Sequence, residues 1–311
     1  MEARELRPSP FHCMNSPGHR LGLLFAVLGA VGFSFKAILI KLAYPYGVDA
    51  VTLLALRMGF SLPFFLALGW HDQRARRPEA LTRRDVLLLL GLGMTGYYLA
   101  SYLDFLGLQY ISAALERLIL FAYPTLVVVL SALFLAKPVS RRAMGSIALC
   151  YAGIALAVAH DLNVTGEMHE VLIGGGLVFA SAVSYAFYLM GNGQAVGRLG
   201  AARVTAWAST AACLLCLAHF ALTRPLGLLV QPAPVLLLAG AMALFCTVLP
   251  VWMVSEAIRC LGAGPVSLIG TLGPVVTLFL GWLILDERIG LFQILGGGLV
   301  VAGVMLVGKR G

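Results

Sequence analysis

Six ionisable residues interrupt the long apolar stretches of this chain. They are Lys36, Arg57, Asp104, Glu116, Arg117 and Glu256. A charged side chain inside a membrane-spanning segment is expensive, and it usually faces a charged partner or a polar cavity. The three positive and three negative charges sum to zero, so these groups can neutralise one another. They are therefore the first candidates for a binding site.

Asp104 and Arg117 are predicted to form an ion pair. They flank a tight turn near residues 110 and 111, each six to seven residues from its centre. In an antiparallel helical hairpin both groups then lie at the same depth, about 9–10 Å below the tip at 1.5 Å per residue. One open interpretation is that the pair only holds the hairpin together. The other is that Asp104 or Glu116 binds a substrate or a proton.

Aromatic and hydroxyl side chains share faces of the same expected helices. Tyr97, Ser101 and Asp104 recur at helical spacing, so they lie on one face. Rings of Tyr or Trp can pack against the apolar part of a solute or against a cation. Near span ends such residues can instead anchor a helix at the membrane surface. The predicted substrate-binding residues are Lys36, Tyr97, Tyr98, Ser101, Tyr102, Asp104, Glu116, Arg117, Tyr123, Tyr185, Tyr188, Trp252 and Glu256.

The composition of the whole chain is that of a polytopic membrane protein. Of its 311 residues, 60% are hydrophobic and 12% are charged, and the mean hydropathy is +0.92. These values exclude a soluble domain and a disordered chain, and they argue against a nucleic-acid partner despite the net charge of +8. Because a helix needs about 20 apolar residues to cross a bilayer, we predict an all-α fold of ten transmembrane helices. The expected spans are 21–43, 48–69, 86–108, 112–135, 142–159, 171–191, 202–222, 234–258, 264–285 and 290–308.

The positions of the basic residues predict the orientation of these spans. Most Lys and Arg residues fall on one side when the N-terminus is placed in the cytoplasm, as the positive-inside rule requires. Acidic residues such as Asp161 and Glu167 fall in loops on the opposite side. Both termini are therefore expected in the cytoplasm, with residues 1–20 as a flexible tail. The expected location is the bacterial inner membrane.

The second half of the sequence repeats the first with an offset of about 150 residues. Ala113 then aligns with Ala263, and Pro124 aligns with Pro274. The expected repeats are residues 21–160 and 171–308. Because each would hold five spans, an odd number, the two repeats must have opposite orientations. Many secondary transporters have this inverted arrangement, with the substrate site near the membrane midplane between the repeats.

Three residues are expected to shape the helices instead of contacting a solute. Pro124 and Pro274 each free a backbone carbonyl four residues earlier and bend their helix, which makes them candidate hinges at matching positions of the repeats. Arg57 lies near the middle of its span. We expect a structural role for it, through hydrogen bonds to backbone carbonyls.

The repeated segments resemble the drug/metabolite transporter superfamily, of the EamA type. The first repeat carries "GLQYISAALERLILFAYPTL", with a small-residue turn and then a proline, and the second ends in the loop "ILDERIG" and a glycine-rich span. The loop "LAKPVSRR" departs from the family pattern, because Lys137 stands where an acidic residue is common. Arg57, in "LRMGFSL", matches a recurring arginine of the family. The resemblance implies ten helices, cytoplasmic termini and transport of small metabolites without ATP.

We therefore predict a secondary transporter that exports small metabolites or amino-acid-like solutes by alternating access. Proton coupling through Asp104, Glu116 or Glu256 is a hypothesis that their position in the spans motivates. The alternatives are a facilitated exchanger or importer of metabolites such as nucleosides or vitamins, and a membrane scaffold without transport. No catalytic set, metal cluster or phosphate-binding loop is recognisable, so we expect neither an enzyme nor a cofactor. The expected partners are membrane lipid, a small solute and protons.

Overall fold

The computed structural model describes residues 17–76, 81–136 and 138–308, and all regular structure within them is helical. Most of the predicted tail, residues 1–20, lies outside the described residues, and so does Lys137. The first half contains α1 (Pro17–Ala43), η2 (Tyr44–Tyr46), α2 (Ala50–Arg76), α3 (Arg83–Leu92), η3 (Gly93–Leu99), α4 (Ala100–Gly107), α5 (Ala113–Leu120), α6 (Tyr123–Leu135) and α7 (Arg141–Thr165). The second half contains α8 (Met168–Leu199), α9 (Ala201–Thr223), η4 (Leu226–Leu229), α10 (Ala233–Ala243), η5 (Leu244–Val248), α11 (Leu249–Leu261), α12 (Ala263–Gly270), α13 (Leu272–Leu285) and α14 (Leu291–Gly308).

Nine helical stretches among the described residues are long and apolar enough to cross a membrane. Several consist of consecutive elements, since α3, η3 and α4 form one stretch, α5 and α6 another, and α10, η5 and α11 a third. A tenth apolar helix, Leu291–Leu306 within α14, is shorter. The chain is therefore a multi-pass membrane protein. Nine of the ten predicted spans have a matching stretch, and the tenth stays a prediction.

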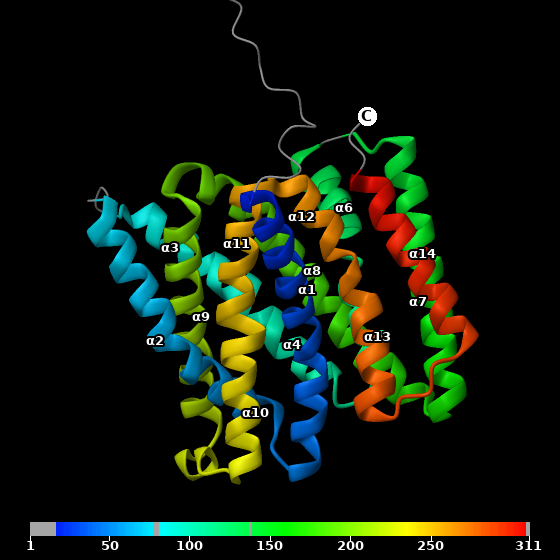
Figure 1. The fold of residues 1–311 in the computed structure, drawn as a ribbon. Helices are drawn as coiled ribbons and strands as arrows, with labels where there is room; N and C mark the ends of the chain where they lie inside the picture. The colour runs from blue at the N-terminus through cyan, green and yellow to red at the C-terminus, as the bar shows by residue number, and fades with distance from the viewer. Residues whose placement is uncertain (1–16, 77–80, 137, 309–311) are drawn as a thin grey trace, which may run out of the picture.

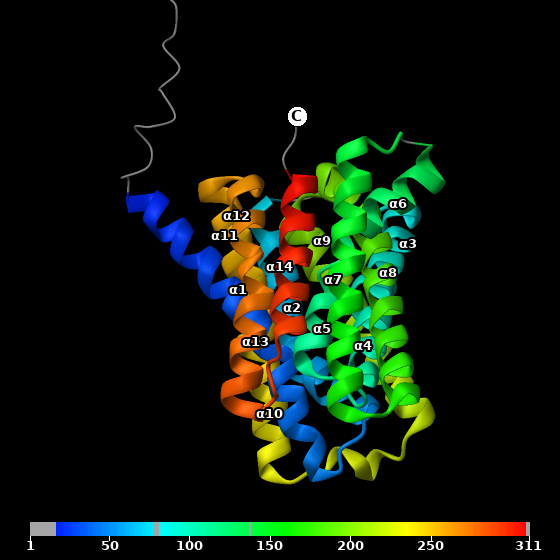
Figure 2. The ribbon, with the colours of Figure 1, turned by 90° about the vertical axis from the view of Figure 1, so that its right-hand side faces the viewer.

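The helices form one upright bundle in which elements of the two halves interleave (Figure 1). Helix α7 packs against α14 and α2 packs against α9, while α1 contacts α11 and α4 contacts α8. Figure 2 shows α7 and α14 side by side along the bundle. Helix α1 begins and α14 ends at the same end of the bundle (Figure 1). We call this end the terminal face and the opposite end the distal face.

The two halves also share unusual local structure. A π-helical segment occurs in the third stretch of each half, as η3 and η5. Two non-glycine residues with positive φ, Ala136 at 50° and Asp286 at 52°, cap the C-termini of α6 and α13, the helices that carry Pro124 and Pro274. These two residues are 150 positions apart, which is the offset of the sequence repeat. The same backbone irregularities thus recur at corresponding places in the halves.

Small residues allow α7 and α14 to pack closely. A Cβ atom at Gly153 would lie 2.5 Å from the carbonyl oxygen of Gly296, so a larger residue does not fit there. Nearby, the hydroxyl of Ser146 donates a hydrogen bond to the carbonyl of Gly303. In lipid, where burial of apolar surface drives helix association less strongly, such close packing holds helices together.

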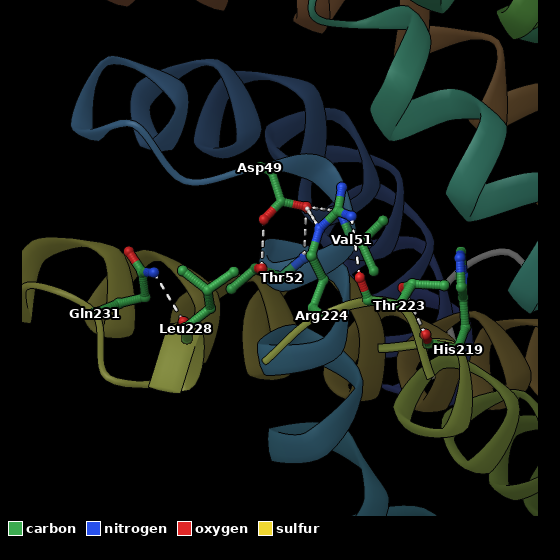
Figure 3. A network of polar contacts seen from close by, with 8 residues as sticks. All are labelled: Asp49, Val51, Thr52, His219, Thr223, Arg224, Leu228 and Gln231. Atoms are coloured by element: carbon green, nitrogen blue, oxygen red, sulfur yellow. Dashed lines mark hydrogen bonds and ion pairs between the residues drawn. The ribbon is translucent and has the colours of Figure 1, made fainter. Parts of the chain in front are cut away.

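A polar network closes the distal face between α2 and the segment after α9 (Figure 3). Asp49 precedes α2 and accepts hydrogen bonds from the backbone N–H groups of Val51 and Thr52, so it caps the helix N-terminus. Arg224 reaches the same carboxylate at 3.3 Å. Partial burial opposes ionisation of Asp49, but the hydrogen bonds from Thr52 and Arg224 outweigh it and hold the pKa below its ordinary value.

Candidate functional site

Three of the predicted residues form a buried charged cluster where α1, α4 and α5 meet. The Lys36 ammonium lies 2.6 Å from the Asp104 carboxylate and 3.1 Å from that of Glu116. Glu116 is fully buried, the Asp104 side chain is 2% exposed and the Lys36 side chain is 16% exposed. Two carboxylates therefore share one ammonium group. We call these three residues the charged cluster.

Short connections and a capped helix start position the charged cluster. Helix α4 ends at Gly107 and α5 begins at Ala113 behind the capping hydroxyl of Ser112, so the two acidic residues face each other across a hairpin. The Tyr44 hydroxyl, just beyond α1, donates a hydrogen bond to the carbonyl of Phe105 in α4. This contact holds α1 against the hairpin, and Lys36 lies two turns back along α1.

The predicted pairing of Asp104 with Arg117 is wrong. Asp104 pairs with Lys36, because α1 packs against the hairpin and brings a cation closer than the one on α5. The equal depth of Asp104 and Arg117 was a sound geometric expectation for two helices. It could not include a third helix from elsewhere in the sequence.

Three oxygen atoms of the charged cluster accept no hydrogen bond among the described residues, although one of them, Oε1 of Glu116, lies 3.1 Å from the Lys36 ammonium. They are Oδ1 of Asp104 and both carboxylate oxygens of Glu116. Buried polar atoms without a partner are rare, and those that occur often mark a functional site or a bound group. The cluster carries one more negative than positive charge when both carboxyls are ionised. It can therefore hold a proton or the cationic group of a solute.

Arg117 extends instead from the first half of the chain to α13 in the second half. A Cβ atom at Gly273 would lie 2.6 Å from Nη2 of Arg117, so the guanidinium occupies the space that the glycine leaves open. The Nε of Arg117 is buried without a hydrogen-bond partner among the described residues. Ser34 of α1 donates to the Gly273 carbonyl at 3.2 Å and so fixes this part of α13.

Arg57 is buried elsewhere and makes a contact of a different kind from the one expected. Its Nε donates to the Thr247 hydroxyl of η5 at 3.0 Å, where a backbone carbonyl was expected. Its guanidinium lies over the ring of Phe105, 5.5 Å from the centroid. The residue is 6% exposed. It thus links α2, η5 and α4 within the bundle.

Four of the predicted tyrosines form one aromatic cluster between η3, α6 and α8. The hydroxyls of Tyr97 and Tyr188 lie 3.2 Å apart, and their ring centroids are separated by 5.3 Å. Tyr185 packs against Tyr188 at 5.5 Å and against Tyr123 at 5.3 Å. We call these four residues the tyrosine wall.

Tyr98 and Tyr102 do not belong to the tyrosine wall. Their rings stack on each other at 6.3 Å and pack against His219 of α9, whose Nδ1 lies 3.1 Å from the Tyr98 hydroxyl. Ser101, between them in sequence, is half-buried. Tyr97 and Asp104, which were expected on one face of this span, contact different helices: Tyr97 reaches Tyr188 of α8 and Asp104 reaches Lys36 of α1.

Trp252 and Glu256 also lie apart from the charged cluster. Glu256 accepts a hydrogen bond from Arg259, one turn further along α11, and its side chain is 29% exposed. Trp252 packs against the Phe25 ring of α1 at 5.3 Å and is exposed. Glu256 was expected among the buried charges of the spans. The structure places it on an accessible part of α11 with its own partner.

At the distal face, two acidic residues that the sequence prediction left out bind the start of α5. Glu287, in the loop after α13, accepts hydrogen bonds from the backbone N–H groups of Ala113 at 2.7 Å and Ala114 at 3.3 Å. Asp161, near the end of α7, accepts from the backbone and hydroxyl of Ser112. Burial raises the pKa of Glu287, against the opposing effect of the two N–H groups and Lys41. The loop motif "ILDERIG" was the available signal for Glu287.

Both predicted hinge prolines follow a break between two helices. Helix α5 ends at Leu120 and α6 begins at Tyr123, so Pro124 lies in the first turn of α6. In the second half, α12 ends at Gly270 and α13 begins at Leu272, with Pro274 in its first turn. Proline is tolerated there because the first turn of a helix does not use the missing N–H. Their role as hinges stays a prediction.

Comparisons with known proteins agree with the fold and with the membrane location. The model of the EamA-like transporter family matches residues 20–159 and 172–309. The Uncharacterized transporter YcbK of Bacillus subtilis (strain 168) is 30% identical over 285 residues, 89% of each chain. The S-adenosylmethionine/S-adenosylhomocysteine transporter of Chlamydia muridarum (strain MoPn / Nigg) is 26% identical over 245 residues, 75% of each chain.

A solved structure has the same fold at low sequence identity. Its sequence is 18% identical, and it superposes on this chain with a TM-score of 0.62. The superposition covers 92% of this chain and 94% of the solved chain. The family model matches twice, once in each half, and the two matches together cover most of the chain. The chain belongs to the EamA-like transporter family, within the drug/metabolite transporter superfamily.

Proposed function

We propose that this protein is a proton-coupled secondary transporter that exports small amino-acid-like solutes by alternating access. The observation that carries the proposal is the charged cluster, in which Asp104 and Glu116 share the ammonium of Lys36. An unpaired charge at this depth is unfavourable. One additional positive charge, from a proton or from a solute, neutralises the cluster.

Competition for the same carboxylates couples the two movements. When the cluster holds a proton, its charge is balanced and a cationic solute group is not needed. When the ammonium group of a solute enters, it takes the place of the proton, because both together would give the cluster a surplus positive charge. A proton and a solute that exclude each other at one site are exchanged across the membrane, so a proton gradient drives export.

The bundle supplies the two halves that alternating access requires. We propose that ten helices form two inverted repeats of five, and that the hairpins α4–α5 and α11–α12 act as gates with Pro124 and Pro274 beside them. By the positive-inside rule, the terminal face is cytoplasmic and the distal face is external. Glu287 joins the loop of one half to the α5 start of the other, which supports a closed external gate.

The chemistry of the interior and one relative support an amino-acid-like solute. The bundle interior holds two carboxylates, the guanidinium of Arg117 next to Glu116 in α5, and packed tyrosine rings, so a solute with charged groups and an apolar part has candidate partners for each. A relative named an S-adenosylmethionine/S-adenosylhomocysteine transporter carries molecules built on an amino acid. The solute class proposed here is accordingly small and amino-acid-like.

Transport by the purified protein in proteoliposomes tests the proposal. A thermal-shift screen with the common amino acids and S-adenosylmethionine first selects a stabilising solute, whose labelled form is then used for transport. Glu116→Gln and Asp104→Asn should lose proton-driven accumulation and keep solute exchange without a gradient. The exposed Glu167→Gln is the matched control and should behave as the wild type. Undiminished gradient-driven transport in the double variant would overturn proton coupling, and uptake without a gradient effect would favour a facilitated exchanger.

A further inference from the structure

A cavity of about 560 Å³ lies where the loop after α13 leads into α14, at the edge of the bundle (Figure 1). Its walls are the last turn of α13, this loop and the first turn of α14. None of the lining residues belongs to the charged cluster or to the tyrosine wall. Pockets that hold small ligands have about 300–1,000 Å³, so the cavity is large enough for a ligand. The lining residues are Trp282, Asp286, Glu287, Arg288, Ile289 and Ile294.

Contacts with both halves of the chain fix the backbone of this loop. The N–H of Glu287 donates to the carbonyl of Gly281 at 3.1 Å, and the Glu287 carboxylate accepts from the N–H of Ala113. The carbonyl of Arg288 accepts a hydrogen bond from Nε2 of His160 at 2.7 Å. The loop is therefore held in place before any ligand arrives, and binding there requires little ordering of the chain.

Two charged side chains of this cavity have no partner in the part of the chain that the structure describes. Glu287 directs its carboxylate to α5. Its neighbours Asp286 and Arg288 are exposed, and neither side chain forms an ion pair or a hydrogen bond with another described residue. The free groups are thus one carboxylate and one guanidinium, whose charges sum to zero. The complementary ligand carries one anionic and one cationic group.

The apolar part of the cavity faces the lipid. Trp282 is 53% exposed and Ile294 is 58% exposed, and Leu283 and Leu291 on the same two helices are also exposed. Exposed apolar surface of this kind contacts acyl chains in a membrane protein, and tryptophan is frequent at the level of the headgroups. Trp282 and Ile294 each lie about one helical turn, roughly 5 Å, from the charged loop. The cavity thus joins a charged rim to an apolar wall, as a phospholipid joins its headgroup to its acyl chains.

We propose that this cavity binds a phospholipid with a zwitterionic phosphate–ammonium headgroup, in the leaflet at the distal face. Arg288 binds the phosphate, because a guanidinium matches phosphate oxygens with two parallel hydrogen bonds. Asp286 binds the primary ammonium group, while Trp282 and Ile294 pack against the glycerol and the adjoining acyl carbons. The bound lipid anchors the connection between α13 and α14 at the membrane surface.

The same contacts disfavour two other occupants. An anionic phospholipid finds a partner in Arg288 but is repelled by Asp286. A soluble molecule with the same headgroup fits the charges but leaves Trp282 and Ile294 uncovered. The inference goes beyond the proposed function, since the site shares no residue with the charged cluster and its test measures no transport.

Native mass spectrometry of the full-length protein in detergent tests the inference with two lipids of equal acyl chains. Dioleoyl phosphatidylethanolamine has both charged groups, and dioleoyl phosphatidylglycerol has only the phosphate. The wild type should bind the ethanolamine lipid more tightly. Arg288→Gln should weaken binding of both lipids about three- to tenfold, as expected for a bidentate ion pair at a partly exposed position. Arg142→Gln is the matched control, because it removes an exposed arginine at the opposite end of the bundle, and it should bind both lipids as the wild type does.

A second variant separates the two headgroup contacts. Asp286→Asn removes the carboxylate and keeps a residue type that tolerates the positive φ of 52°. It should weaken the ethanolamine lipid severalfold and bind the glycerol lipid at least as tightly as the wild type does, so the preference between the lipids disappears. Gel filtration of each variant checks that it is folded.

A photo-crosslinkable phosphatidylethanolamine in liposomes locates the bound lipid. Its label should concentrate on the peptide that covers Trp282–Ile294 in the wild type and decrease there severalfold in Arg288→Gln, while labelling of other peptides stays the same.

Four results would overturn the inference. They are equal binding of the two lipids to the wild type, a preference that survives Asp286→Asn, the same small effect for Arg288→Gln as for Arg142→Gln, or labelling of Trp282–Ile294 no stronger than elsewhere. Soluble glycerophosphoethanolamine provides a fifth test. If it displaces the lipid at concentrations close to those of the lipid itself, the site recognises a soluble metabolite and the lipid assignment is wrong.

Discussion

Removing the Glu287 carboxylate should loosen the start of α5 at the distal face. This carboxylate comes from the second half of the chain and is the hydrogen-bond acceptor that the structure gives to the N–H groups of Ala113 and Ala114. In Glu287→Ala both donors lose their partner in a buried place. The substitution therefore tests whether one loop holds the two halves together at this face.

The two distances set the expected magnitude. The bond from Ala113 at 2.7 Å is short, as is typical when the acceptor is charged, and the bond from Ala114 at 3.3 Å is weak. Hydrogen bonds to a charged group contribute about 1.5–3 kcal/mol, so we take about 2–3 kcal/mol for the pair. At 1.4 kcal/mol per tenfold change, this corresponds to about 30- to 150-fold in the equilibrium between closed and open forms.

Hydrogen–deuterium exchange measured by mass spectrometry reports this equilibrium. A peptide that covers the α5 start should exchange about 30- to 150-fold faster in Glu287→Ala, while a peptide at the Asp49-capped start of α2 keeps its rate. Asp286→Asn is the matched control, because it removes the neighbouring acid of the same loop and retains a residue type that tolerates its positive φ of 52°. Unchanged exchange in Glu287→Ala, or equal acceleration in Asp286→Asn, would refute the reasoning.

Three further substitutions have distinct expected effects. Lys36→Met removes the ammonium that Asp104 and Glu116 share, and it should lower the free energy of unfolding in denaturant by about 3 kcal/mol near neutral pH. This destabilisation should shrink at acidic pH, because a carboxyl that takes up a proton no longer leaves an unpaired buried charge. Asp49→Ala should cost about 1 kcal/mol near neutral pH through the lost cap. Because the pKa of Asp49 is lowered, the difference from wild type should disappear as the pH falls through that pKa, and a difference independent of pH would contradict this origin. Gly153→Ala should lower the unfolding temperature strongly, since no space exists against α14, and wild-type stability would show that the helices separate easily.

The sequence alone predicted the class of fold because the membrane constrains it strongly. Long apolar stretches must be helices, and the offset of 150 residues between matching prolines indicated two similar halves. The buried groups of the charged cluster were also predictable. Few charges occur in the spans, and Lys36, Asp104 and Glu116 were all among them.

The pairing of these groups was not predictable, because it depends on which distant helices touch. Local spacing can place Asp104 opposite Arg117 in a hairpin, but it contains no information on α1, which brings Lys36 to Asp104 and Glu116. Helical spacing likewise could not tell that Tyr97 contacts Tyr188 of α8 while Asp104 contacts Lys36 of α1. Glu287 was missed because its carboxylate gains a role only through a contact between the two halves of the chain. It accepts a hydrogen bond from the backbone N–H of Ala113, at the start of α5 in the other half.

Proton release on solute binding tests the shared carboxylates of the charged cluster most directly. In weakly buffered detergent solution with a pH indicator, binding of the amino-acid-like solute selected by the thermal-shift screen should release up to about one proton per solute from the wild type, since the ammonium group replaces the proton. Glu116→Gln, which cannot ionise at that position, should bind solute and release none. Equal proton release from the variant, or saturable binding to the wild type without any release, would contradict competition between proton and solute at Asp104 and Glu116.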